Sequence, residues 1–141
     1  MALLHDVAEA LVGDITPADG IPKVEKSRRE TTTMEYFTKG LLGKVYNGIN
    51  GKDLMAVWQE YEDGKTLESK FVHDVDKLEL ILQMLEYEKT HEYEKRPGKL
   101  DLGEFSGVIK QVQLPEVRDW CVEILKEREE HWKNIGKEHT T

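Results

Sequence analysis

Residues 3–14, Leu-Leu-His-Asp-Val-Ala-Glu-Ala-Leu-Val-Gly-Asp, decide how this chain is interpreted. A His, an Asp and a Glu lie close together in a run otherwise built from Ala, Leu and Val, and a Gly-Asp pair follows. The apolar spacing predicts a helix over residues 2–12 that ends at the glycine. On such a helix, rotation by about 100° per residue places Asp6 about 100° and Glu9 about 40° from His5. All three side chains would then share one edge.

An imidazole and a carboxylate on one edge can bind a single divalent cation. Glu9, one turn further, would be able to reach a water molecule on that cation. The alternative is that His5 is a hydrogen-bonded core residue and that the His-Asp pair arises by chance, as it does again at His73-Asp74. The complete spacing, His-Asp-x-x-Glu-x-x-x-Gly-Asp, favours a metal site with His5 and Asp6 as its first ligands.

A further ligand is expected from the longest predicted helix, residues 67–93. Asp76 lies next to the apolar stripe of that helix, where a carboxylate is costly to bury unless it is paired or coordinated. The stripe consists of Phe71, Val75, Leu78, Leu82 and Leu85. His73 and Asp74 compete with Asp76 for this role. The pattern favours Asp76 without settling the choice.

Composition limits the remaining possibilities. A chain of 141 residues suits one domain, and 38% hydrophobic with 34% charged residues is typical of a globular, strongly helical protein. The net charge of −8 argues against binding to a nucleic-acid polymer, because no basic face is available to displace phosphate counterions. No apolar stretch is long enough to cross a membrane. A single cysteine fits a reducing cytosol, so we expect a cytoplasmic protein, with a nuclear location as the alternative. The single cysteine, Cys121, falls in an apolar stripe and is expected to pack in the core.

Local signals predict an all-α fold with a frayed tail at residues 133–141. A loop rich in Gly and Pro covers residues 13–22, and its last residue, Pro22, suits the entry to the next helix. Thr66 is the expected N-cap of the longest helix, and Pro115 is expected to open the last helix. Beyond the first and longest helices, further helices are expected at residues 23–42, 53–62 and 115–132, with a weak one around Phe105 and Ile109. The second of the predicted helices opens with the chain's only concentrated positive charge. A solvated face is its default explanation, and contact with a substrate phosphate, through Lys23 or Arg28, is the alternative.

Two blocks of sequence resemble a known family, the HD-domain 5′-deoxynucleotidases, and the likeness spans residues 2 to about 130. The first block is His-Asp-Val-Ala-Glu-Ala-Leu-Val-Gly-Asp-Ile-Thr-Pro-Ala-Asp at residues 5–19, with Ile-Pro-Lys at 21–23 and Glu-Lys-Ser-Arg-Arg-Glu at 25–30. The second is Lys-Phe-Val-His-Asp-Val-Asp-Lys-Leu-Glu-Leu-Ile-Leu-Gln at residues 70–83, followed by Glu86-Tyr87 and by Arg-Pro-Gly at 96–98.

The resemblance implies an HD-domain-like bundle of about five to six helices that removes the 5′-phosphate of deoxynucleoside monophosphates. It implies a divalent cation, either Mn, Co or Mg, with Zn and Fe also compatible with the ligands, and a homodimer. By matching position, His5, Asp6 and Asp76 are implied as metal ligands. Glu9 and Asp14 are implied as the catalytic carboxylates, and His73-Asp74 has no implied role.

One departure from the family concerns the region before the motif. The family's first metal-binding His and a substrate-contacting Arg–aromatic pair lie upstream of it, and this sequence has no such residues. We therefore expect residues 1–132 to form a single HD-type phosphohydrolase domain, truncated at its N-terminus relative to the family. Two alternatives stay open: an HD phosphohydrolase of another small-nucleotide class, and a catalytically impaired module for binding or oligomerisation.

Overall fold

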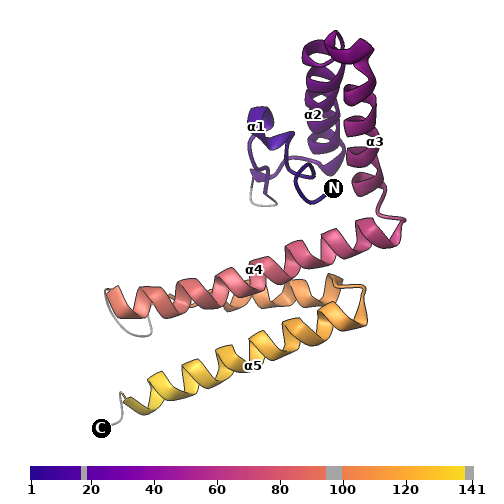
Figure 1. Ribbon diagram of the computed structural model, residues 1–141. Helices are drawn as coiled ribbons and strands as arrows, with labels where there is room; N and C mark the ends of the chain where they lie inside the picture. The colour runs from indigo at the N-terminus through magenta and orange to yellow at the C-terminus, as the bar shows by residue number, and fades with distance from the viewer. Residues whose placement is uncertain (17–18, 95–99, 139–141) are drawn as a thin grey trace. The chain divides into compact units, whose positions relative to one another are not determined.

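The computed structural model describes residues 1–16, 19–94 and 100–138. Every regular element in these ranges is helical, which confirms the all-α prediction. The chain divides into two compact units, Met1–Ser69 and Lys70–Thr141, and each is described here by itself (Figure 1). In the described part of the chain, no helix is both long and apolar enough to span a membrane.

The first unit is a helical hairpin with a short helix beside it (Figure 1). Its elements are α1 (Glu9–Val12), α2 (Lys23–Glu35), the π-helical turn η2 (Tyr36–Leu41), the 3-10 turn η3 (Val45–Gly48) and α3 (Ile49–Asp63). Pro22 directly precedes α2, as predicted, because its fixed φ suits a helix entry. The helix predicted over residues 23–42 is found as α2 continued by η2. Helix α3 begins four residues before its predicted start at residue 53.

The core of the first unit joins α2, α3 and the turn before α1. Ala8, Met34 and Trp58 are almost completely buried against one another. Close approach of α3 to η2 depends on Gly51, because a Cβ at this position would lie 2.2 Å from the Thr38 carbonyl oxygen. The packing of this hairpin therefore holds α1 and the following loop against α2.

The predicted helix over residues 2–12 is wrong for most of its length. Helix α1 covers only Glu9–Val12, and the preceding residues form turns. Several backbone bonds there span three residues, such as Leu4 N to Met1 O at 2.8 Å and Glu9 N to Asp6 O at 2.9 Å. The residue before α1 is Ala8, which has no side chain able to cap a helix. The helical angles calculated for Asp6 and Glu9 relative to His5 therefore do not apply. The succession of turns determines where these side chains lie instead.

The second unit consists mainly of α4 (Leu67–Glu94), the 3-10 segment η4 (Gly103–Gln111) and α5 (Pro115–Glu138). The hydroxyl of Thr66 accepts the Ser69 amide at 3.2 Å, so the predicted cap of α4 is confirmed. Pro115 opens α5 as predicted. Helix α5 continues six residues past its predicted end at residue 132, so residues 133–138 are helical rather than frayed. Residues 139–141 and the Arg-Pro-Gly sequence at 96–98 lie outside the described residues.

The core of the second unit is formed where α4, the end of η4 and α5 meet. Its fully buried members are Ile81, Met84, Val112, Val117 and Cys121, so the core position predicted for the cysteine is confirmed. The stripe predicted for α4 is only partly buried, because Phe71 and Leu82 are 45% and 42% exposed. The residues that contact α5 determine the buried face of α4.

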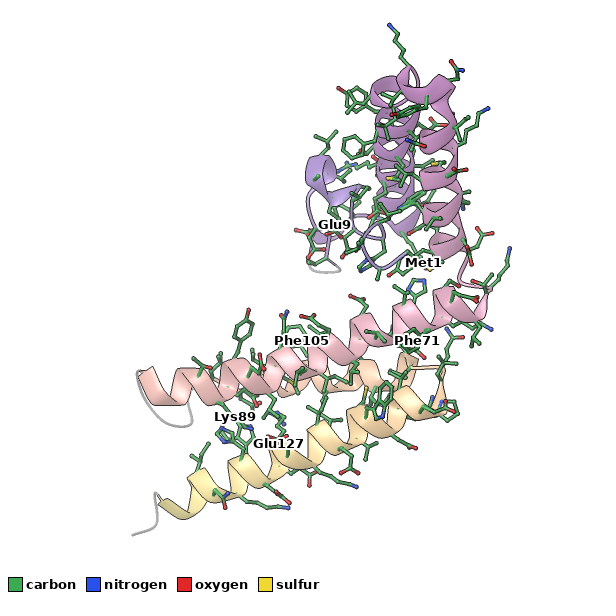
Figure 2. The ribbon with its side chains drawn as sticks, viewed as in Figure 1. Met1, Glu9, Phe71, Lys89, Phe105 and Glu127 are labelled. Atoms are coloured by element: carbon green, nitrogen blue, oxygen red, sulfur yellow. The ribbon has the colours of Figure 1, made fainter. Side chains whose placement is uncertain are left out.

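Polar contacts also join α4 to α5. Lys89 pairs with Glu127 near the C-terminal half of α4 (Figure 2). Nearby, the buried carboxylate of Glu88 accepts two hydrogen bonds from Arg128 at 2.9 Å, one from the Leu102 amide at 2.7 Å and one from the Trp132 indole at 3.0 Å. A buried carboxylate is tolerated when all its partners are present. Glu88 therefore holds α4, η4 and α5 together.

Candidate functional site

His5 has one ring nitrogen fixed by the backbone and the other next to a carboxylate. Its Nδ1 lies 2.7 Å from the Ala2 carbonyl oxygen. A carbonyl oxygen only accepts hydrogen bonds, so Nδ1 is the donor. Nε2 then faces Asp6, whose Oδ2 is 3.0 Å away. The buried ring of Tyr61 packs edge-on against the imidazole, with ring centroids 5.0 Å apart, and restricts its orientation.

This pair of donors fits a divalent cation. Metal-binding His residues commonly donate their second ring N–H to a backbone carbonyl, which directs the remaining nitrogen at the metal. His5 has this arrangement, and Asp6 supplies a carboxylate oxygen 3.0 Å from the second ring nitrogen. Asp76, the predicted further ligand, is an exposed residue of α4 in the second unit. Across residues 1–16, 19–94 and 100–138, no three His, Cys, Asp or Glu side chains gather closely enough to hold a metal. A site that includes Asp76 stays a prediction.

Glu9 lies at the start of α1 and is partly buried (Figure 2). Burial raises the pKa of its carboxyl above the usual value, and the negative charges of Asp6 and Asp14 raise it further. The ammonium of Lys26 acts in the opposite direction. A carboxyl whose pKa is shifted towards neutrality is well suited to accept and release a proton. Asp14 is exposed in the loop after α1, where Gly13 turns the chain at φ 79°.

Lys26 of α2 connects the loop after α1 to acidic side chains of α2 and α3. Its Nζ donates to the Ile15 carbonyl oxygen at 3.0 Å and lies 3.7 Å from the Glu30 carboxylate. Burial raises the pKa of Glu30, whose side chain is only 12% exposed, and Lys26 opposes that shift. Desolvation likewise raises the pKa of Glu62 on α3, which Lys26 and Lys23 oppose. The i,i+4 spacing of Lys26 and Glu30 was a sequence signal for their contact, but no pattern indicated Glu62.

The two candidate phosphate-binding side chains lie on exposed parts of α2. Lys23 is close enough to Glu62 to affect its pKa. Arg28 donates twice to Glu25, which also accepts from Arg29, and these bonds lower the pKa of Glu25 to about 2. Arg28, but not Lys23, borders a cavity of about 350 Å³ that is lined by Leu11, Val12, Arg28, Arg29, Thr32 and Thr33. Substrate contact by Lys23 or Arg28 stays a prediction.

Asp74, the competitor of Asp76, is completely buried and binds backbone amides. Its carboxylate accepts the Gln113 amide at 2.9 Å and the Leu114 amide at 2.7 Å, and the Lys77 ammonium lies 3.9 Å away. These two amides directly precede α5, so the carboxylate fixes the start of that helix. The carboxylate oxygens of Asp74 are thus engaged in the structure of the second unit.

The chain is similar to known proteins along almost its whole length. The HD domain model matches residues 1–118. The chain is 39% identical over 140 residues to 5′-deoxynucleotidase YBR242W of Saccharomyces cerevisiae, covering 99% of this chain and 56% of that protein. It is 38% identical over 135 residues to 5′-deoxynucleotidase hdd1 of Schizosaccharomyces pombe, covering 96% and 65%. It is 40% identical over 128 residues to human 5′-deoxynucleotidase HDDC2, covering 91% and 58%.

The chain thus spans between about half and two thirds of the length of these relatives. The HD domain match includes the His5-Asp6 pair, Glu9 and Asp14, together with Asp76. Because that match covers well over half of the sequence, this protein belongs to the HD domain family.

Proposed function

We propose that the protein is a metal-dependent phosphohydrolase that removes the 5′-phosphate of deoxynucleoside monophosphates. The curated relatives that it matches are named 5′-deoxynucleotidases. The observation that carries the proposal is the arrangement of His5, whose Nδ1 is held by the Ala2 carbonyl while Nε2 lies 3.0 Å from Asp6 Oδ2. This pair would serve as two cation ligands, and the raised pKa of the nearby Glu9 carboxyl would suit proton transfer.

His5 and Asp6 would hold the cation, and Asp76 is the proposed third ligand. When bound, a divalent cation offsets phosphate charge and lowers the pKa of the attacking water. Mn, Co and Mg suit such a mixture of nitrogen and oxygen ligands, as do Zn and Fe. Charge on the neighbouring residues supports a cation here, since Asp6, Asp14 and Glu30 all raise the pKa of Glu9.

Glu9 would orient the attacking water and accept its proton. The water oxygen then forms a bond to phosphorus while the bond from phosphorus to the sugar 5′-oxygen breaks. The departing oxygen needs a proton, and we assign to Asp14, in the exposed loop, the role of supplying it or of contacting the sugar. In the alternative assignment, Asp14 orients the water and Glu9 acts on the leaving oxygen. Single substitutions of the two carboxylates distinguish these assignments.

Phosphate release tests the proposal directly. The purified chain is supplied with deoxynucleoside and ribonucleoside monophosphates, with Mn, Co or Mg added singly. We expect release from deoxynucleotides, and we expect Glu9→Ala to abolish turnover while bound metal, measured by elemental analysis, stays largely in place. Loss of metal from that variant would make Glu9 a ligand instead.

Two other outcomes would favour the alternatives. Release from a different class of small nucleotide would indicate another HD phosphohydrolase. No release with any metal would indicate a binding or oligomerisation module. Light scattering would test the homodimer, which stays a prediction together with the cytoplasmic location.

A further inference from the structure

Lys26 connects the loop that carries Asp14 to the helix that packs against it. Its Nζ donates to the carbonyl oxygen of Ile15, the residue after Asp14, at 3.0 Å. Glu30, one turn further along α2, lies 3.7 Å from the same ammonium and is largely buried. Ile15 itself is buried. The lysine is therefore held between its own helix and the backbone of the loop rather than extended into solvent.

The same ammonium lies among carboxylates from three parts of the first unit. The charged groups that act on Glu9 are Asp6, Asp14, Lys26 and Glu30. Lys26 is the one cation in that set, and it favours the ionised form of Glu9 where the others oppose it. Glu62 of α3 also faces Lys26, and it increases the negative charge around Glu30.

We propose that Lys26 is a positioning residue for the hydrolysis, fixing the loop that carries Asp14 relative to Glu9 through the Ile15 carbonyl. This inference rests on the proposed function and adds to it a residue that acts through the backbone of the loop. The charge of Lys26 has a second effect, since it extends to lower pH the range in which Glu9 accepts a proton. Glu30 holds the ammonium in place for both roles.

A lysine that only stabilises the fold would behave differently from a positioning residue. Loss of a purely structural bond lowers the free energy of unfolding but leaves the pH profile of the remaining activity unchanged. Loss of a positioning residue moves the catalytic carboxylates, and displacement by about 1 Å lowers turnover by roughly 100-fold. The two roles are therefore separated by measuring kcat, KM and the pH profile together.

The experiment compares Lys26→Met, Lys26→Arg and Lys39→Met with the unchanged chain in the phosphate-release assay. We expect Lys26→Met to lower kcat by roughly 100-fold with little change in KM. The acidic limb of its kcat/KM profile should move to higher pH, because Glu9 loses the charge that favours ionisation. Lys26→Arg should restore the position of the limb. Lys39, an exposed lysine of η2 that pairs with Glu35, is the matched control and should change nothing.

A Lys26→Met protein that keeps the original kcat and pH profile would overturn the inference. Urea unfolding of each variant identifies any loss of activity that comes from unfolding alone. If the unchanged chain releases no phosphate, the proposed hydrolysis fails by itself. Carboxyl-carbon NMR titration of Glu9 then decides the role of Lys26, since an identical titration in Lys26→Met would contradict it.

Discussion

Replacing Asp74 separates the structural aspartate of α4 from the proposed ligand two residues further on. Asp74→Ala removes a completely buried carboxylate that accepts the Gln113 and Leu114 amides at 2.9 and 2.7 Å. It also leaves the Lys77 ammonium, whose side chain is 16% exposed, without the carboxylate 3.9 Å away. Two part-buried amides at the start of α5 then lose their carboxylate acceptor.

The size of the effect follows from these contacts. An unsatisfied buried amide costs about 1–3 kcal/mol, and breaking a buried charged interaction costs about 3–5 kcal/mol. Because these effects overlap, we expect the free energy of unfolding to fall by about 3–5 kcal/mol. At the lower end this is a decrease of roughly 6–12 °C in Tm. Asp74→Asn keeps one acceptor oxygen and should lose about 1–3 kcal/mol.

Urea unfolding followed by circular dichroism, with metal content measured on the same samples, provides the assay. We expect Asp74→Asn to be less stable but to retain its metal. Asp76→Asn, an exposed position on the same helix, should lose metal with a smaller change in the unfolding midpoint. An Asp74→Ala protein as stable as the unchanged chain would refute the role of Asp74 at the start of α5. Loss of metal from Asp74→Asn alone would refute the assignment of Asp76.

Three further substitutions test other parts of the structure. Glu88→Ala should destabilise the second unit by about 3–5 kcal/mol, because its buried donors lose their shared acceptor; an unchanged urea midpoint would contradict this. Glu9 has a raised pKa, so the folded state binds its proton more tightly and stability falls as pH rises from below 4.5 through the raised value. In EDTA, Glu9→Gln should therefore gain more in Tm at pH 7 than at pH 4, and equal gains would disprove the shift. Gly51→Ala should cost about 1–3 kcal/mol through contact with a carbonyl 2.2 Å away, whereas Gly107→Ala, with open space around it, should show no such loss.

Local signals in the sequence were sufficient for much of the helical layout. Pro22 and Pro115 mark the starts of α2 and α5, and Thr66 caps α4. Each signal acts within one helical turn, through a fixed φ or a single hydrogen bond, so the neighbouring residues determine the outcome. The choice of His5 and Asp6 as a pair also depended on adjacent positions, and their side chains do meet.

Features that depend on distant segments required the tertiary structure. Asp74 binds amides 39 and 40 residues away, so its sequence neighbours do not indicate its role. Packing against α5 selects Ile81 rather than Leu82 for the core, since either lies near the apolar stripe of α4. Lys26 reaches Ile15 only because α1 and its loop fold back onto α2. The sequence by itself therefore determined where most of the helices lie, though not the extent of the first one, and which residue types could hold a cation, because both follow from short-range geometry. Only the tertiary structure decided which carboxylates are buried, paired or shifted in pKa, because burial and charge depend on every segment that packs nearby.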